Sequence, residues 1–203
     1  LAVNTSKSVV MVFERQGSTQ PPPVSINVSN QTLVQVESFK YLGVHFHRTQ
    51  WTREACATLA QPATRATWAL WKGALSKGVV CRDTLLRIFR TQVLPIALYG
   101  GGVWGMHYLS VAHSDGVLAS PAQGVQNLFL RLISKAYDST SRWVLHLNTG
   151  MAPVQLALFQ AAARLWNSLK SEEQLLEKAL RSDITLFLRG NDSNWSRQFL
   201  KHG

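Results

Sequence analysis

The chain has 203 residues, 46% of them hydrophobic, and this balance argues against a disordered protein. Lys and Arg number 21 against 11 Asp and Glu, so the net charge is +10, which favours nucleic acid first and an anionic membrane surface second as partners. No apolar run approaches the roughly 18 residues that a membrane span needs, so we expect no membrane-embedded role.

The start of the chain and its cysteines indicate in which cellular compartment we expect the protein. Leu1 is not a methionine, and no charged segment precedes an apolar one, so we expect the interior of a longer reading frame rather than a signal peptide. Cys56 and Cys81 lack Cys-x-x-Cys spacing. This predicts two reduced thiols in the core of an intracellular protein.

The first 48 residues predict β-structure. Residues 9–13 form a short apolar run that is typical of a buried strand, and residues 24–28 and 33–36 flank a turn as in a β-hairpin. Residues 39–46 predict one further strand, with Gly43 inside it. A glycine there indicates a bulge or a close approach by another backbone, for which nucleic acid is one candidate. We therefore expect a small antiparallel sheet.

Helical spacing replaces this pattern from Trp51 onward. Residues 51–75 predict an alanine-rich helix with a kink or break at Pro62, and residues 82–99 predict the clearest helix, kinked at Pro95 and ended by three glycines. Further helices are expected over 121–135, over 153–170 as a segment buried nearly all round, and onward from Ser171. Residues 103–120 and 139–150 are expected to be a loop and a connector.

The fold class is therefore α+β, with three parts. We expect residues 1–48 to form the sheet region, 49–105 a helical domain and 106–203 a downstream helical region. Between Ala55 and Lys170 there are eleven Lys or Arg and three acidic residues, so the basic excess lies in the helical part. A solvated surface accounts for scattered charge, but it explains an excess of one sign across successive helices less readily, and a nucleic-acid interface is the alternative.

Four segments, in order, resemble the reverse transcriptases of non-long-terminal-repeat (LINE-type) retrotransposons. Residues 1–13 resemble the family's fourth polymerase motif, with Ser8 where threonine is usual. Phe39-Lys40-Tyr41-Leu42-Gly43 is similar to the primer-grip motif. Trp51 with its alanine-rich helix, and the Pro95…Tyr99-Gly100…Trp104 pattern, resemble the thumb and the region after it. The resemblance covers roughly residues 1–105 and implies the end of a palm, a thumb and part of a downstream region.

The chain departs from the family at the polymerase centre. The family holds two Mg²⁺ ions on an aromatic-x-Asp-Asp turn and an earlier aspartate, because nucleotidyl transfer needs both metals. No Asp-Asp pair occurs in this sequence. We therefore expect a fragment that is not catalytic alone and holds no cofactor, with Mg²⁺ implied only for the complete enzyme.

The resemblance assigns roles only to matching positions. Lys7 matches a lysine that protonates the pyrophosphate leaving group, whereas the residues alone predict a surface lysine. Arg87 and Arg90, three residues apart and off the apolar stripe, would contact the duplex backbone, whereas the residues alone predict a solvated face. The primer-grip positions, at which Tyr41 is equally compatible with the core, are Lys40, Tyr41, Leu42 and Gly43.

Several other histidines and tryptophans are interpreted as structural residues rather than as part of a binding or metal site. His45 and His47 share a strand face without a third ligand nearby, so we expect ordinary histidines rather than a metal site. We expect core positions rather than base-stacking platforms for three tryptophans, Trp68, Trp71 and Trp104.

Three functions compete. The leading one is a fragment of an RNA-directed DNA polymerase that contacts an RNA template and a DNA primer, together with the rest of the polymerase polypeptide, in the nucleus and cytoplasm. The second is a degraded or co-opted basic helical module that binds nucleic acid. The third is a structural helical interaction domain. A steep loss of nucleic-acid affinity with salt favours the first two over the third.

Overall fold

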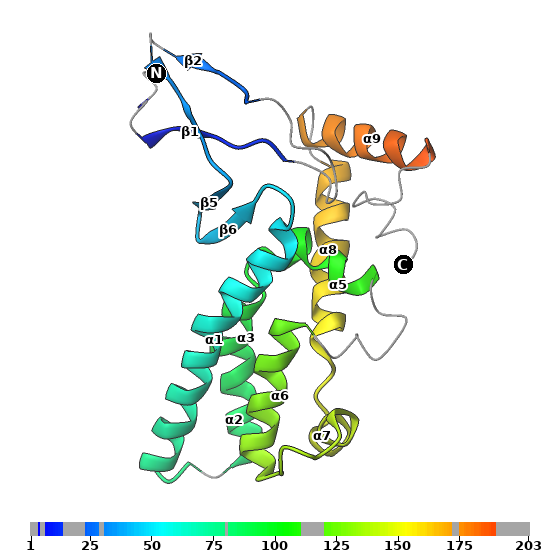
Figure 1. Cartoon of the computed structure of the whole chain (residues 1–203). Coiled ribbons are helices and arrows are strands. Elements are labelled where there is room, and N and C mark those ends of the chain that lie inside the picture. Colours follow the sequence, from blue (N-terminus) through cyan, green and yellow to red (C-terminus); the bar gives the residue numbers. More distant parts are fainter. Residues whose placement is uncertain are drawn as a thin grey trace.

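The computed structural model describes residues 4, 7–13, 23–28, 31–79, 81–110, 120–171 and 175–189. The protein is mixed α+β, with the strands gathered at one end of a bundle of helices (Figure 1). Within the described ranges the strands are β1 (Val9–Val10), β2 (Asn27–Val28), β3 (Gln31–Thr32), β4 (Val34–Gln35), β5 (Ser38–Tyr41) and β6 (Val44–His47).

The strands pair two by two instead of forming one antiparallel sheet, so that expectation is wrong for the described residues. β1 pairs with β4 in parallel, with Val9 opposite Val34. A parallel pair needs a long connection, and here the chain between β1 and β4 includes the β2–β3 hairpin. β2 and β3 are antiparallel, so the predicted hairpin is confirmed, with its register set by Asn27 opposite Thr32.

The expected strand over 39–46 is also wrong, because β5 and β6 form a hairpin of their own. Ser38 lies opposite His47 and Tyr41 lies opposite Val44, which leaves Leu42 and Gly43 as a two-residue turn. Both turn residues have positive φ, 47° and 86°. Two-residue hairpin turns of this kind match the right-handed twist of the strands. The glycine thus marks a turn rather than a bulge.

The helices run from residue 51 to the end of the described chain. Their bounds are α1 (Trp51–Ser76), α2 (Arg82–Ile88), α3 (Leu94–Ala97), α4 (Gly101–Trp104), α5 (Met106–Ser110), α6 (Pro121–Ser134), α7 (Arg142–Thr149), α8 (Val154–Ser171) and α9 (Leu175–Leu188), with a π-helical segment η2 (Phe89–Val93) between α2 and α3.

The two predicted proline distortions have different outcomes. Pro62 lies inside α1, which runs on through it without a break. Before Pro95 the α-helical hydrogen bonding gives way to the π-helix η2. Proline has no N–H to donate to the carbonyl four residues earlier, and a wider turn accommodates the freed acceptor.

Three helices differ from the sequence-based expectations. Residues 101–110 contain α4 and α5, and residues 142–149 form α7, where a loop and a connector were predicted. The predicted helices over 121–135 and 153–170 are confirmed as α6 and α8. However, α8 is not buried all round, because Leu156 is 49% exposed.

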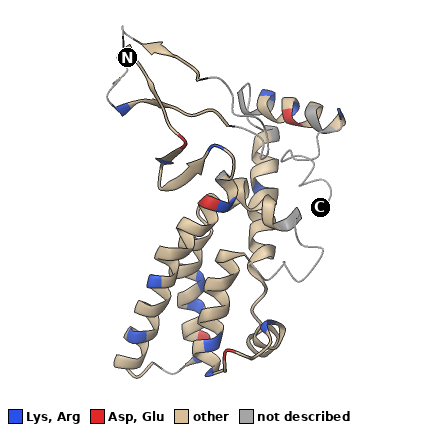
Figure 2. Cartoon of the chain, viewed as in Figure 1, with Lys and Arg blue, Asp and Glu red and all other residues tan. Residues whose placement is uncertain are grey.

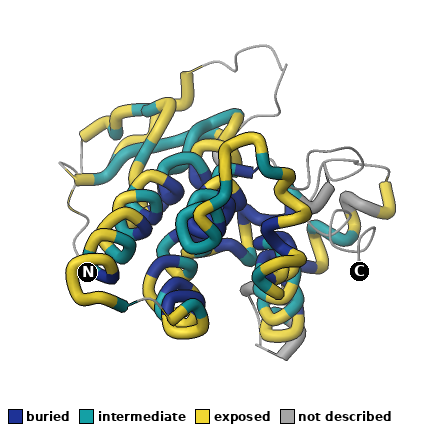
Figure 3. Tube along the Cα trace, turned by 90° about the horizontal axis from the view of Figure 1, so that it is seen from below, coloured by how far each residue is buried: buried dark blue, intermediate teal, exposed yellow. Residues whose placement is uncertain are grey.

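One hydrophobic core joins the hairpin to the helices. It extends from Val44 in β6 to Leu158 in α8, and buried residues gather between the helices while exposed ones cover the outer faces (Figure 3). At its centre the rings of Phe89 and Phe129 stack with their centroids 4.1 Å apart. None of the described helices is long and apolar enough to cross a membrane.

The contact between α4 and α8 depends on small residues. A Cβ atom on Gly101 would lie 2.8 Å from Leu158 Cδ2, and one on Gly102 would lie 2.9 Å from the Ala161 carbonyl oxygen. Both separations are shorter than Cβ atoms tolerate, and the atom that faces Gly102 belongs to the backbone, so Gly102 sets how closely the two helices approach.

Candidate nucleic-acid interface

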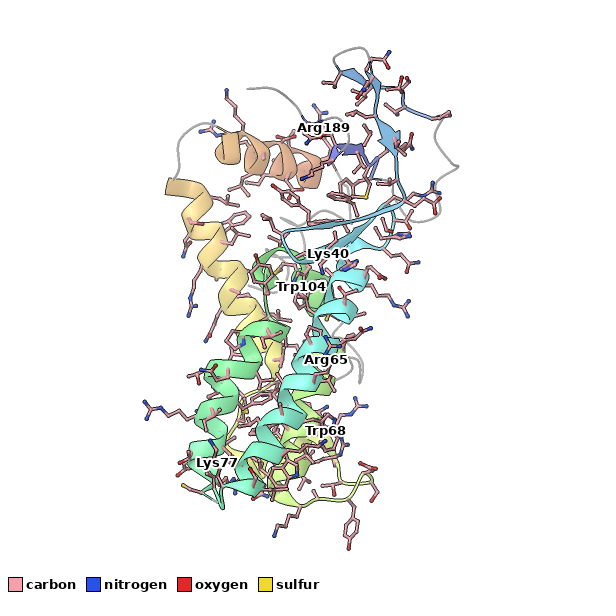
Figure 4. The ribbon with its side chains drawn as sticks, turned by 90° about the vertical axis from the view of Figure 1, so that its left-hand side faces the viewer. Lys40, Arg65, Trp68, Lys77, Trp104 and Arg189 are labelled. Carbon is pink, nitrogen blue, oxygen red and sulfur yellow. The ribbon has the colours of Figure 1, made fainter. Side chains whose placement is uncertain are left out.

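The tip of the β5–β6 hairpin presents the primer-grip positions to solvent. Lys40 is exposed and pairs with His45 across the hairpin, which lies above α1 in Figure 4. Tyr41 is 59% and Leu42 71% exposed, so Tyr41 is not a core residue. The hairpin thus offers a lysine, an aromatic ring and an aliphatic side chain at one projecting turn.

Gly43 lies where the hairpin meets the helical bundle. Its positive φ of 86° is what the turn requires, and this alone accounts for a glycine. A Cβ atom added there would lie 3.9 Å from Tyr99 Cε1, an ordinary contact. The tip therefore rests beside Tyr99 at the end of the α3 segment.

The segment from Tyr99 to Trp104 forms a corner next to the hairpin. The indole Nε1 of Trp104 donates a hydrogen bond to the Tyr99 carbonyl oxygen at 2.8 Å, and Trp104 is 1% exposed. Gly100 between them has a φ of 66°, and a Cβ atom there would lie 3.9 Å from Val44 Cγ2. The structure thus brings together the primer-grip-like segment and the Tyr-Gly…Trp segment, 56 residues apart between Gly43 and Tyr99.

The base of the hairpin is held by polar contacts. The guanidinium of Arg48 lies 3.4 Å from the Glu37 carboxylate, and the Arg48 amide donates to the Glu37 carbonyl oxygen at 2.9 Å. His47 Nδ1 lies 3.3 Å from both the amide and the hydroxyl of Thr49. Among the described residues no three His, Cys, Asp or Glu side chains are grouped so that they could hold a metal ion.

Arg87 and Arg90 are both exposed, but they lie apart from the hairpin. Arg87 belongs to α2, which begins at the end of the bundle away from the strands (Figure 1). Arg90 lies in η2 and lines a cavity of about 280 Å³, together with Gln126 and residues 150–154. Lys7 is exposed in a short turn before β1, among the strands. The structure therefore does not gather the seven candidate residues at one place.

A buried polar cluster reaches the cavity beside Arg90 through Gln126. Gln123 Nε2 lies 2.8 Å from Gln126 Oε1, 3.0 Å from Asn127 Oδ1 and 3.1 Å from His146 Nε2. His146 Nδ1 lies 2.7 Å from the Met151 carbonyl oxygen, which can only accept, so Nδ1 carries the proton and Nε2 accepts from Gln123.

The same cluster holds the connection between α7 and α8. The Val154 amide donates to Gln123 Oε1 at 2.8 Å and to Gln126 Oε1 at 3.1 Å. Gln126 Nε2 donates to the Ala152 carbonyl oxygen at 2.8 Å. The extended segment before α8 is therefore fixed to α6 by side chains, and with it the cavity wall.

Three of the sequence-based assignments concern tryptophan. Trp104 is confirmed as a core residue, and Trp71 packs against the core while partly buried. Trp68 is 42% exposed, so its assignment to the core is wrong. Arg65, Trp68 and Lys72 follow the three- and four-residue spacing of one helical face, and all three are exposed on α1. Figure 4 shows Arg65 and Trp68 along this helix. That spacing was the signal in the sequence for a basic and aromatic stripe.

The two cysteines differ. Burial raises the pKa of Cys56, which is fully buried and faces Tyr108, and burial likewise raises the pKa of the Tyr108 hydroxyl. Cys81 is exposed, so its assignment to the core is wrong, and hydrogen bonding from the Thr84 hydroxyl lowers the pKa of its thiol. Burial, assisted by the charge of Arg53, lowers the pKa of His107.

No family model matches this chain, and no curated protein and no solved structure matches it either.

Proposed function

We propose that this chain is the palm-to-thumb part of an RNA-directed DNA polymerase resembling those of non-long-terminal-repeat retrotransposons, and that it contacts the primer–template duplex without catalysing synthesis alone. The observation that carries the proposal is the packing of the hairpin tip at Gly43 beside Tyr99 and Gly100. Two segments that resemble the family only weakly in isolation are neighbours in space.

Charge supports a nucleic-acid partner at this surface. Lys and Arg residues are exposed on the hairpin, on α1 and on α2, while acidic side chains are few there (Figure 2). Phosphate contacts of this kind position a nucleic acid without reading its sequence. In the proposal Lys40 holds the primer strand at the hairpin tip, Arg87 and Arg90 contact the duplex further along the bundle, and Lys7 acts as the general acid only in the complete enzyme.

We expect the chain to bind duplex nucleic acid with little sequence preference. If about four phosphates are neutralised, the logarithm of the affinity falls against the logarithm of salt concentration with a slope of about −3 to −4. Arg87→Ala combined with Arg90→Ala should make the slope shallower by about two, and Lys40→Ala by about one. Fluorescence anisotropy with a labelled duplex over a salt series measures the slope.

The matched control is Arg164→Ala combined with Lys178→Ala, which removes two exposed cations on α8 and α9. This variant has the same net charge as the arginine double variant, so a difference between the two slopes reports position rather than total charge. A slope near zero for the unchanged chain, or equal slopes for the two double variants, contradicts the proposed contacts.

We also expect no primer extension by this chain alone. No Asp-Asp pair is present in the sequence, and without bound metal ions the charge that develops on the phosphoryl oxygens has no counter-ion. The assay uses an RNA template, a DNA primer, deoxynucleotides and Mg²⁺. Template-dependent synthesis by the purified chain would overturn this expectation. Adding a family palm in trans separates the polymerase fragment, which supports synthesis, from a co-opted binding module, which does not.

A further inference from the structure

The end of the bundle away from the strands carries large exposed rings that the proposed function does not use. Tyr137, in the connection between α6 and α7, is 84% exposed, and Trp143 at the start of α7 is 56% exposed. Val144 and Leu147 continue the same outer side of α7 and are 52% and 83% exposed. The inner side of this short helix is occupied by the buried Leu145 and His146.

Cationic side chains also lie at this end of the bundle (Figure 2). α1 and α6 both end here, and α2 begins here (Figures 1 and 2). The guanidinium of Arg82 donates to the Asn148 carbonyl oxygen, which joins the start of α2 to α7. We define the distal surface as the rings of Tyr137 and Trp143 with the cations Lys135 and Arg142, which are close to them in the chain, and Arg82, which contacts α7.

We propose that the distal surface binds single-stranded nucleic acid, with unpaired bases stacked on Tyr137 and Trp143 and phosphates beside the cations. This surface goes beyond the proposed function, since it needs neither the resemblance nor the duplex contacts at Lys40, Arg87 and Arg90. The proposed duplex contacts and the proposed distal surface can therefore be confirmed or contradicted independently of each other.

The combination of rings and cations is what favours a single strand. Single-strand binding proteins pair a basic surface, which follows the phosphates, with aromatic side chains on which bases stack. A duplex hides the faces of its bases within its own stack, so exposed rings gain little from it. Arg142 directly precedes Trp143, and Lys135 stands two residues before Tyr137, so each ring has a cation beside it in the chain.

The stretch between the rings disfavours a membrane or a dry protein interface. All five residues from Asp138 to Arg142 are polar or charged, and four of them are exposed. Inserting both rings into hydrocarbon would bury these groups without hydrogen-bond partners, which is costly. A wet surface with stacked bases leaves them in water.

The test compares substitutions that keep or remove the rings. In Tyr137→Leu with Trp143→Leu the side chains stay apolar but cannot stack, whereas Tyr137→Phe with Trp143→Phe retains two rings. Trp68→Leu removes an exposed ring from α1, outside the distal surface. Anisotropy with labelled oligo(dT) and oligo(rU) of 20 nucleotides, and with a 20-base-pair duplex, gives the affinities, while circular dichroism and thermal unfolding check that each variant is folded.

We expect the leucine pair to weaken single-strand binding by a factor of about 25 or more, since losing one stacked base weakens binding roughly fivefold or more. The single-strand affinity should change by less than about threefold in the phenylalanine pair, which retains the stacks, and in Trp68→Leu, which lies outside the distal surface. The duplex affinity of every variant should also change by less than about threefold. Unchanged single-strand affinity in the leucine pair overturns the proposal. An equal loss of duplex affinity in the leucine pair also overturns it. The proposal fails as well if the phenylalanine pair binds phosphatidylserine vesicles and single strands do not compete for that binding.

Discussion

Gln123→Leu is expected to lower the free energy of unfolding by about 2–6 kcal/mol, because two buried acceptors lose their partner and each costs about 1–3 kcal/mol. These acceptors are Asn127 Oδ1 and His146 Nε2, both of which face Gln123 Nε2 inside the bundle. Val154 keeps one amide hydrogen bond, to Gln126 Oε1. Urea unfolding followed by circular dichroism measures the difference.

The control for this substitution is Gln92→Leu, the same chemical change at an exposed position of η2. It should alter the free energy of unfolding by no more than about 0.5 kcal/mol, as surface changes usually do. If Gln123→Leu proves as mild as Gln92→Leu, the hydrogen bonds of Gln123 do not stabilise the bundle.

Gly102→Ala is expected to destabilise the chain by about 1–3 kcal/mol through overpacking. Its Cβ atom would lie 2.9 Å from the Ala161 carbonyl oxygen, which belongs to the backbone of α8 and cannot turn aside. The helices α4 and α8 would have to separate, and Leu158, which contacts Gly101 from the core, would move with α8.

Gly124→Ala in α6 is the matched control, because nothing lies within 4 Å of its added Cβ atom. Both substitutions add one methyl group to a helical glycine, and in open space this stabilises a helix by about 0.5–1 kcal/mol. The two variants should therefore change stability in opposite directions in the same unfolding experiment. A gain in both would show that α4 and α8 are not in close contact.

The helical part of the fold could largely be predicted from the sequence, because a long apolar stripe at helical spacing has few alternative structures. The helices α6 and α8 were predicted to within about a residue. The short helix α7 was missed, since eight residues give little more than two turns of pattern and its outer side carries Trp143 and Leu147 where polar residues are usual. Whether both sides of a helix are buried depends on the elements that pack around it, and the sequence pattern of the helix does not show these.

The β-region was harder to predict for a different reason. A hairpin with a two-residue turn and a single strand with a bulge give the same alternation, and the usual signal for the turn is Asn-Gly or Asp-Gly. Here Leu42 occupies the first turn position at a φ of 47°, which is uncommon for a leucine. Of the candidate site residues, the hairpin positions are exposed together, whereas Arg87 and Lys7 lie apart from them. Spacing along the sequence does not give the distance in space between residues on different elements.

The hairpin packs firmly against the helical bundle, and this determines how a force applied at its tip is transmitted. Val44, the first residue after the turn, is part of the core, β6 packs along α1, and the turn touches Tyr99. A pull on Lys40 is therefore transmitted into the helices rather than absorbed by bending of the strands. If a nucleic acid bound at the tip advances by one nucleotide, the hairpin and the helices that it packs against must move with it as one rigid unit.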